Sequence, residues 1–98
     1  MNKIKFNDVE FEVESYNKNT SFNGEEINSY ASCSIITNDI ASLGNVAMEE
    51  ITSLQIIHDE EVIYDLHDIH AKIDNINEYL NGDRININVN LKFDTKLA

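Results

Sequence analysis

The first fourteen residues constrain the fold most, because their alternation is compatible with one register of a β-hairpin. Apolar and charged residues alternate through KIKF and again through VEFEVE. A two-residue loop at 7–8 places Phe6 opposite Val9 and Ile4 opposite Phe11, so the apolar side chains share one face. The other face then pairs lysines with glutamates across the ladder, which favours the same register.

Two later stretches also predict strands. Around a three-residue loop at Asp59–Glu61, Ile56 faces Tyr64 and Leu54 faces Leu66, which again gathers apolar groups on one side. The segment 84–93 alternates throughout and predicts a sheet with one face in water. Its inward residues are Ile85, Ile87, Val89, Leu91 and Phe93, and its outward residues are Asn86, Asn88 and Asn90.

The region between the first hairpin and residue 37 is less regular. Residues 15–26 are rich in Asn and Ser, with a turn signal at Asn23–Gly24, and predict either a long exposed loop or an irregular hairpin arm. Residues 27–37 predict a third strand. Its inward side would carry Ile27, Ala31, Cys33 and Ile35.

Two segments have helical spacing. In 38–51, Asn38 is the expected cap and Asp39 lies in the first turn, where a carboxylate meets the positive end of the helix dipole. Gly44 costs about 1 kcal/mol inside a helix, so two short turns, or a helix that ends at Gly44–Asn45, are alternatives. The second helix is predicted over 71–80, where Ile69, Ile73, Ile76 and Leu80 recur at helical intervals and Gly82 follows as a stop.

The predicted fold class is therefore α+β, in the order β-β-β-α-β-β-α-β, with a mainly antiparallel sheet and helices packed on one face. A chain of 98 residues is long enough for one domain, predicted over 1–95. Residues 96–98, KLA, resemble a vector-derived tail. The expected core comprises Ile4, Phe6, Phe11, Val13, Leu54, Ile56, Tyr64, Leu66, Ile73, Ile76, Leu80, Ile87, Val89 and Leu91.

Charge is the most unusual property of the chain. Seven basic and eighteen acidic residues give a formal net charge of −11, and no Lys or Arg occurs between Lys18 and Lys72. Nucleic acids and anionic membrane surfaces require clustered cations, so the chain is expected to bind neither directly. The simplest role of the charge is solubility, and the alternative is an acidic face for a basic protein partner. The candidates for such a face are Glu49, Glu50, Asp59, Glu60, Glu61, Asp65 and Asp68.

The stretch DLHDIH, residues 65–70, contains the most reactive combination of side chains. Asp65, His67 and His70 are types that suit zinc, but His67 and His70 lie on two sides of an expected strand–helix boundary. Asp68 is then a natural N-cap for the following helix. Capping and solvation are therefore the expected roles, and neither a metal nor another cofactor is predicted.

Other catalytic patterns are weak. Cys33 is the single cysteine, which rules out an internal disulfide and suits a reducing cytoplasm; its place among small residues predicts a buried, inert thiol. The three glycines are isolated, so there is no phosphate-binding loop, and no serine occurs in a nucleophile-elbow pattern. No secretion signal or membrane-spanning segment is recognisable. The sequence predicts a protein that is not an enzyme.

The opening third, KIKFNDVEFEVESYNKNTSFNGEEINSYASCSI, resembles small proteins from the structural modules of phages and prophages of low-GC Gram-positive bacteria. The resemblance implies a virion or tail-assembly component that acts through a protein partner or self-association, in the bacterial host cytoplasm or within a virion. Phages also encode small acidic inhibitors of host defence, including anti-CRISPR proteins and nucleic-acid mimics. An inhibitor of that class is the alternative, because residues 19–71 contain no basic side chain other than histidine.

Overall fold

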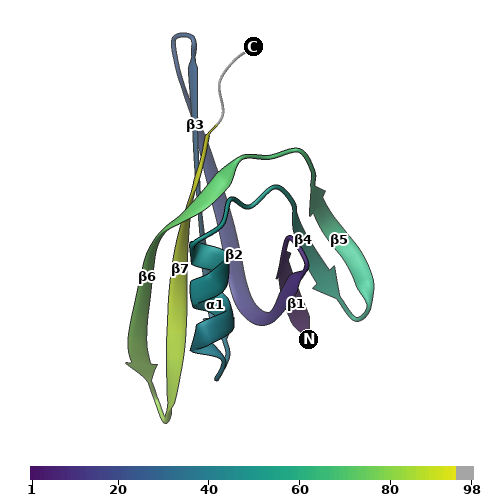
Figure 1. The fold of residues 1–98 in the computed structure, drawn as a ribbon, viewed down its shortest axis with the longest axis vertical. Helices are drawn as coiled ribbons and strands as arrows, with labels where there is room; N and C mark the ends of the chain where they lie inside the picture. The colour runs from purple at the N-terminus through teal and green to yellow at the C-terminus, as the bar shows by residue number, and fades with distance from the viewer. Residues whose placement is uncertain (95–98) are drawn as a thin grey trace.

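The computed structural model describes residues 1–94 and arranges them as one antiparallel sheet with a short helix (Figure 1). The strands are β1 (Asn2–Phe6), β2 (Val9–Asn23), β3 (Glu26–Ile36), β4 (Leu54–His58), β5 (Glu61–Leu66), β6 (Ala71–Asn81) and β7 (Arg84–Phe93). The helix α1 (Ile40–Ala47) follows β3. The spatial order is β5-β4-β1-β2-β3-β7-β6. The predicted domain end at Thr95 and the predicted tail at 96–98 lie outside the described residues.

The predicted α+β class is wrong, because the second helix does not form. Residues 71–80 belong to β6, which pairs with β7 from Ala71 to Asn81. The ladder has a bulge between Ile73 and Asn75, so the inward positions are Ala71 and Ile73 before it and Ile76, Glu78 and Leu80 after it. The step of three residues from Ile73 to Ile76 interrupts the alternation expected of a strand and resembles the spacing of apolar residues in a helix.

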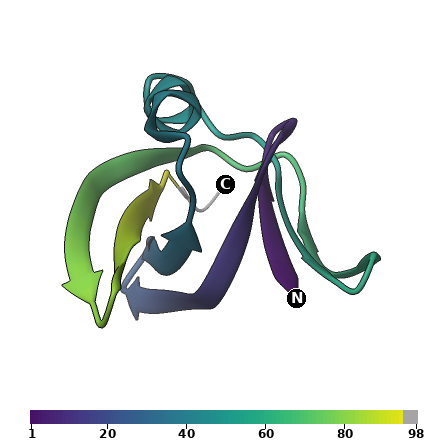
Figure 2. The ribbon, with the colours of Figure 1, turned by 90° about the horizontal axis from the view of Figure 1, so that it is seen from below.

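The sheet is curled, and the chain just before β4 meets the start of β6 across the curl (Figure 2). Ile51, just before β4, and Ala71, at the start of β6, exchange two backbone hydrogen bonds with N···O distances of 2.8 and 3.0 Å. The Ile69 amide also donates to the Thr52 carbonyl oxygen over 3.1 Å. Helix α1 lies across the open side of the curl and buries Leu43 and Val46 against the core.

The first hairpin has the predicted register, with Ile4 opposite Phe11 and Phe6 opposite Val9. In the second hairpin, the predicted pairs of Ile56 with Tyr64 and of Leu54 with Leu66 are also confirmed. Its loop is shorter than predicted, since His58 pairs with Glu61, and a bulge between Ile56 and Ile57 takes up the extra residue. The alternation of apolar residues was enough to predict these two pairs, but it does not indicate where in the hairpin a bulge lies.

The stretch from 15 to 26 extends a strand rather than forming a loop. β2 and β3 pair as far as Asn23 and Glu26, and Gly24 takes φ +64° in the connecting turn. This long hairpin extends beyond the body of the sheet (Figure 1). Helix α1 forms where a helix was predicted, but Asp39 is its N-cap instead of Asn38. The Asp39 carboxylate accepts from the Ser42 amide over 3.1 Å, and Gly44 lies within the helix.

Most of the predicted core is buried. The residues confirmed are Ile4, Phe6, Phe11, Val13, Leu54, Ile56, Ile87, Val89 and Leu91. Tyr64, Leu66 and Ile73 are partly buried and pack against this cluster. The placement of Ile76 and Leu80 in the core is wrong, because 38% and 71% of their surfaces are exposed. Both were assigned to a helix packed on the sheet, whereas they lie on an edge strand that nothing in the described chain covers.

Candidate functional site

The predicted acidic face is divided among separate places. Glu49 and Glu50 follow α1, and Asp68 lies in the β5–β6 connection. Asp59 and Glu60 form the turn at the other end of the β4–β5 hairpin, and Glu61 begins β5. Strands of five and six residues separate these ends by about 16–20 Å. Asp65 lies along β5, paired with Gln55. The sheet therefore does not gather the seven carboxylates into one compact cluster.

Several of these carboxylates also have partners within the chain. Asp59 accepts from the N-terminal ammonium group over 3.0 Å and lies 3.2 Å from the His58 ring nitrogen. These neighbours lower the pKa of Asp59, with the hydrogen bond from the N-terminal ammonium as the largest cause and the charge of His58 next. Asp59 therefore stays ionised, and the positive charge of the N-terminal ammonium group offsets part of the negative charge at this turn.

The DLHDIH stretch does not form one site. His67 Nε2 lies 2.8 Å from Asp65 Oδ2, whereas His70 turns away to Glu50, with 2.9 Å between Nδ1 and Oε1. Asp68 takes a positive φ of 54° in the β5–β6 connection and caps no helix, because a strand follows. Among residues 1–94, no group of three or more His, Cys, Asp or Glu side chains is arranged to hold a metal ion.

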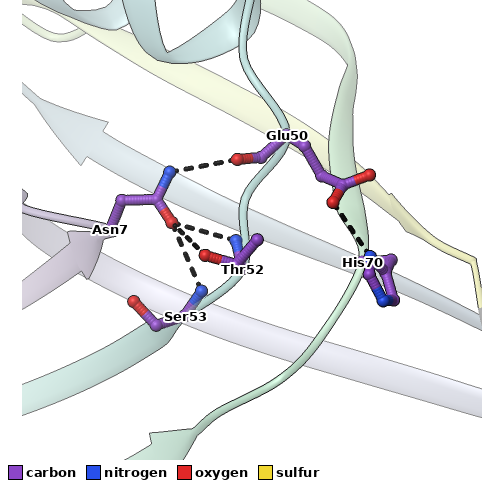
Figure 3. Close-up of polar contacts among 5 residues, drawn as sticks. All are labelled: Asn7, Glu50, Thr52, Ser53 and His70. Carbon is purple, nitrogen blue, oxygen red and sulfur yellow. Dashed lines mark hydrogen bonds and ion pairs between the residues drawn. The ribbon is translucent and has the colours of Figure 1, made fainter.

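Glu50 and His70 belong to a junction that joins three connections of the chain (Figure 3). Asn7, in the β1–β2 turn, donates to the Glu50 carbonyl oxygen over 3.1 Å. Its side-chain oxygen accepts from the amides of Thr52 and Ser53 over 2.9 and 3.3 Å and from the Thr52 hydroxyl over 3.2 Å. These contacts occur beside the place where the sheet closes, so the junction has a structural role.

Cys33 is buried, as predicted, and donates weakly to the Val89 carbonyl oxygen over 3.8 Å. Burial raises the pKa of its thiol to about 12. A thiol of this kind stays protonated at neutral pH and is not a competent nucleophile.

A shallow hollow of about 870 Å³ lies between the β2–β3 turn and the adjoining ends of β6 and β7. Its apolar surface comes from Ile27, Ile73 and Phe93, and both carboxylates and lysines surround it. Lys72 and Lys92 lie directly opposite each other in the β6–β7 ladder. The mixture of signs gives this hollow no preference for one class of ligand.

The most distinctive surface is the outer edge of β6. We call residues 75–81, together with the backbone edge that faces away from β7, the β6 edge. All seven residues are exposed, and no described strand pairs with β6 on that side beyond Ala71. Figures 1 and 2 both show β6 at the margin of the molecule. The apolar side chains of Ile76 and Leu80 lie on its concave side, and Ile85 of β7 is exposed opposite Leu80.

Sequence reasoning missed the β6 edge, because it assigned these residues to a helix. One signal indicated a hairpin. Asn81–Gly82 was interpreted as a helix stop, yet Gly82–Asp83 is a two-residue connection between two alternating apolar stretches, which is typical of a β-hairpin.

The comparisons with known proteins add no relative. No family model, no curated protein sequence and no solved structure matches the chain. Within the described residues, no helix is long and apolar enough to cross a membrane.

Proposed function

We propose that this chain is a protein–protein interaction module without catalytic activity, and that a partner protein docks on the β6 edge. The observation that carries the proposal is a long strand whose outer edge is covered by no described strand, with exposed apolar side chains at Ile76 and Leu80. Such an edge offers unpaired backbone donors and acceptors to an incoming strand, and neighbouring apolar side chains add buried area. The resemblance of the first third to phage structural-module proteins supports a role in virion or tail assembly, in the bacterial host cytoplasm.

Leu80→Asp tests this proposal without threatening the fold, because 71% of Leu80 is exposed. The variant is compared with the parent in co-purification with the proteins encoded by the genes that flank its own. We expect binding to be lost, because an unpaired charge would be buried at the interface. Ile63→Asp is the matched control: it makes the same change at the opposite edge of the sheet, where Ile63 is 58% exposed, and should retain binding.

Salt dependence separates this proposal from its alternative, a small acidic inhibitor of a host defence effector. The net charge of −11 favours the alternative, because long-range attraction would steer such a protein to a basic groove. Docking by backbone pairing and apolar burial should survive moderate salt, whereas binding through exposed charges should be screened. A monomeric protein whose detectable partner is a nucleic-acid-binding effector, released by salt, would replace the first proposal with the second.

A further inference from the structure

We propose that the β6 edge selects an extended segment of another protein in which a Lys or Arg lies between two apolar residues at alternate positions. This inference rests on the proposed docking function and specifies the chemistry of the partner. It follows from three properties of residues 74–83: where the edge is open, which side chains share its concave face, and which charges remain without a counter-ion.

The open part of the edge is confined to the half of β6 after the bulge. Proteins protect edge strands with lysines, bulges and short lengths. In β6 the lysine at Lys72 and the bulge next to Asp74 both lie in the first half, whereas 75–81 has neither device and carries a single charge, Glu78. The opposite edge, β5, has only six residues and carries Glu61 and Asp65. Of the two edges in the described sheet, the second half of β6 is therefore the better template for an added strand.

The concave side of this half presents an apolar–acidic–apolar sequence. Ile76, Glu78 and Leu80 lie opposite Val89, Ile87 and Ile85 of β7, whose side chains define the concave face. An added antiparallel strand would place its own residues opposite these three, on the same face. The favoured partner residues are therefore apolar, basic and apolar in turn.

Charge around the edge points to the same partner. Asp74, Glu78 and Asp83 are acidic, and none of them has an ion pair within the described residues. The neighbouring cation, Arg84, already pairs with Glu14 of β2. A cation in the incoming strand would meet Glu78 directly, and the apolar residues around the pair reduce the screening by water.

A second copy of this chain fits the edge poorly. Antiparallel self-pairing that places Ile76 opposite Leu80 of the other copy necessarily places Glu78 opposite Glu78. Like charges directly opposite each other destabilise a ladder, and two chains of net charge −11 also repel each other at longer range. Glu78 therefore has two effects: it disfavours self-association through this edge and favours a basic partner.

Synthetic peptides provide a direct test. One peptide alternates valine and threonine and carries lysine at the central inward position, and a second carries glutamate there. Both are titrated against the full chain, with β6 amide shifts in NMR as the readout. We expect the lysine peptide to bind roughly fivefold more tightly than the glutamate peptide. Glu78→Lys should reverse this preference, whereas Glu61→Lys, with the same charge change on β5, should leave it unchanged.

The outcomes separate this inference from the function on which it rests. If both peptides bind equally, or if Glu78→Lys does not alter the preference, the selection of a basic residue is wrong. If Leu80→Asp nevertheless abolishes binding, docking at the β6 edge stands. If neither peptide shifts β6 amides at millimolar concentration, or the shifts fall on β5 instead, both the selection and the docking site are wrong.

Discussion

Ile76 and Val89 face each other across the β6–β7 ladder, but Val89 is fully buried whereas 38% of Ile76 remains exposed. The difference arises because β3 flanks Val89 on its other side, through Cys33, and no described strand flanks Ile76. Position in the sheet, rather than side-chain chemistry, thus distinguishes two similar β-branched residues.

This pair gives a first prediction about stability. Val89→Asp should prevent folding or cost more than about 4 kcal/mol, because it buries an unpaired charge between two strands. Ile76→Asp should cost about 1 kcal/mol, because water still reaches the new carboxylate. Urea unfolding of both variants provides the measurement. An equal loss in the two would show that the edge of β6 is covered in solution.

Asn7 gives a second prediction. Its side chain bonds to Glu50, Thr52 and Ser53, and its backbone has φ +55°. Asn7→Gly removes the side chain, but glycine adopts this φ without strain. The variant should lose about 2 kcal/mol of unfolding free energy through the missing hydrogen bonds. Asn7→Ala should cost about 1 kcal/mol more, because an L side chain is strained there. Thermal unfolding of the two variants measures the difference, and identical losses would argue against backbone strain.

His70 gives a prediction about pH. The hydrogen bond from His70 to Glu50 raises the pKa of the imidazole above its ordinary value of 6.5, and the charges of Glu50, Asp94 and Asp68 act in the same direction. Because the folded pKa is the higher one, the contribution of this contact is fully present below pH 6.5. It is lost as the pH rises through the folded value.

NMR titration of the imidazole provides the measurement. The His70 pKa should lie above 6.5 in the parent, and most of the increase should disappear in Glu50→Gln, which removes the main cause. An unchanged pKa in that variant would show that the His70–Glu50 contact does not persist in solution.

Asn86 gives a fourth prediction. It lies on the outer face, as its alternation predicted, but it is buried rather than solvated, and its amide donates to Glu14 Oε2 over 2.8 Å. Asn86→Asp should lower the free energy of unfolding by about 3 kcal/mol at neutral pH, because two ionised carboxylates would then lie next to each other with no hydrogen bond between them. The loss should diminish as the pH falls and protonates the pair. Asn88→Asp, at a half-buried position of the same face, is the control and should cost less than 1 kcal/mol.

The sequence by itself determined the elements whose partner is close in the chain. The hairpins 3–13 and 54–66 were predictable because alternation requires the apolar side chains to share a face, and a slip of one residue would expose them. The strand at 84–93 was predictable for the same reason. Cys33 was predicted to be buried because its neighbours in the sequence are small, although those neighbours do not indicate which strand covers it.

Only the tertiary structure decided the conformation of 71–81 and the position of the functional surface. A bulge next to Asp74 converts the strand period into a three-residue step, and a local pattern cannot distinguish that step from a helix turn. The exposure of Ile76 and Leu80 depends on β6 being the last strand in the order, which is a property of the whole sheet. Likewise, Glu50 meets His70 only because the curl of the sheet brings the α1–β4 and β5–β6 connections together.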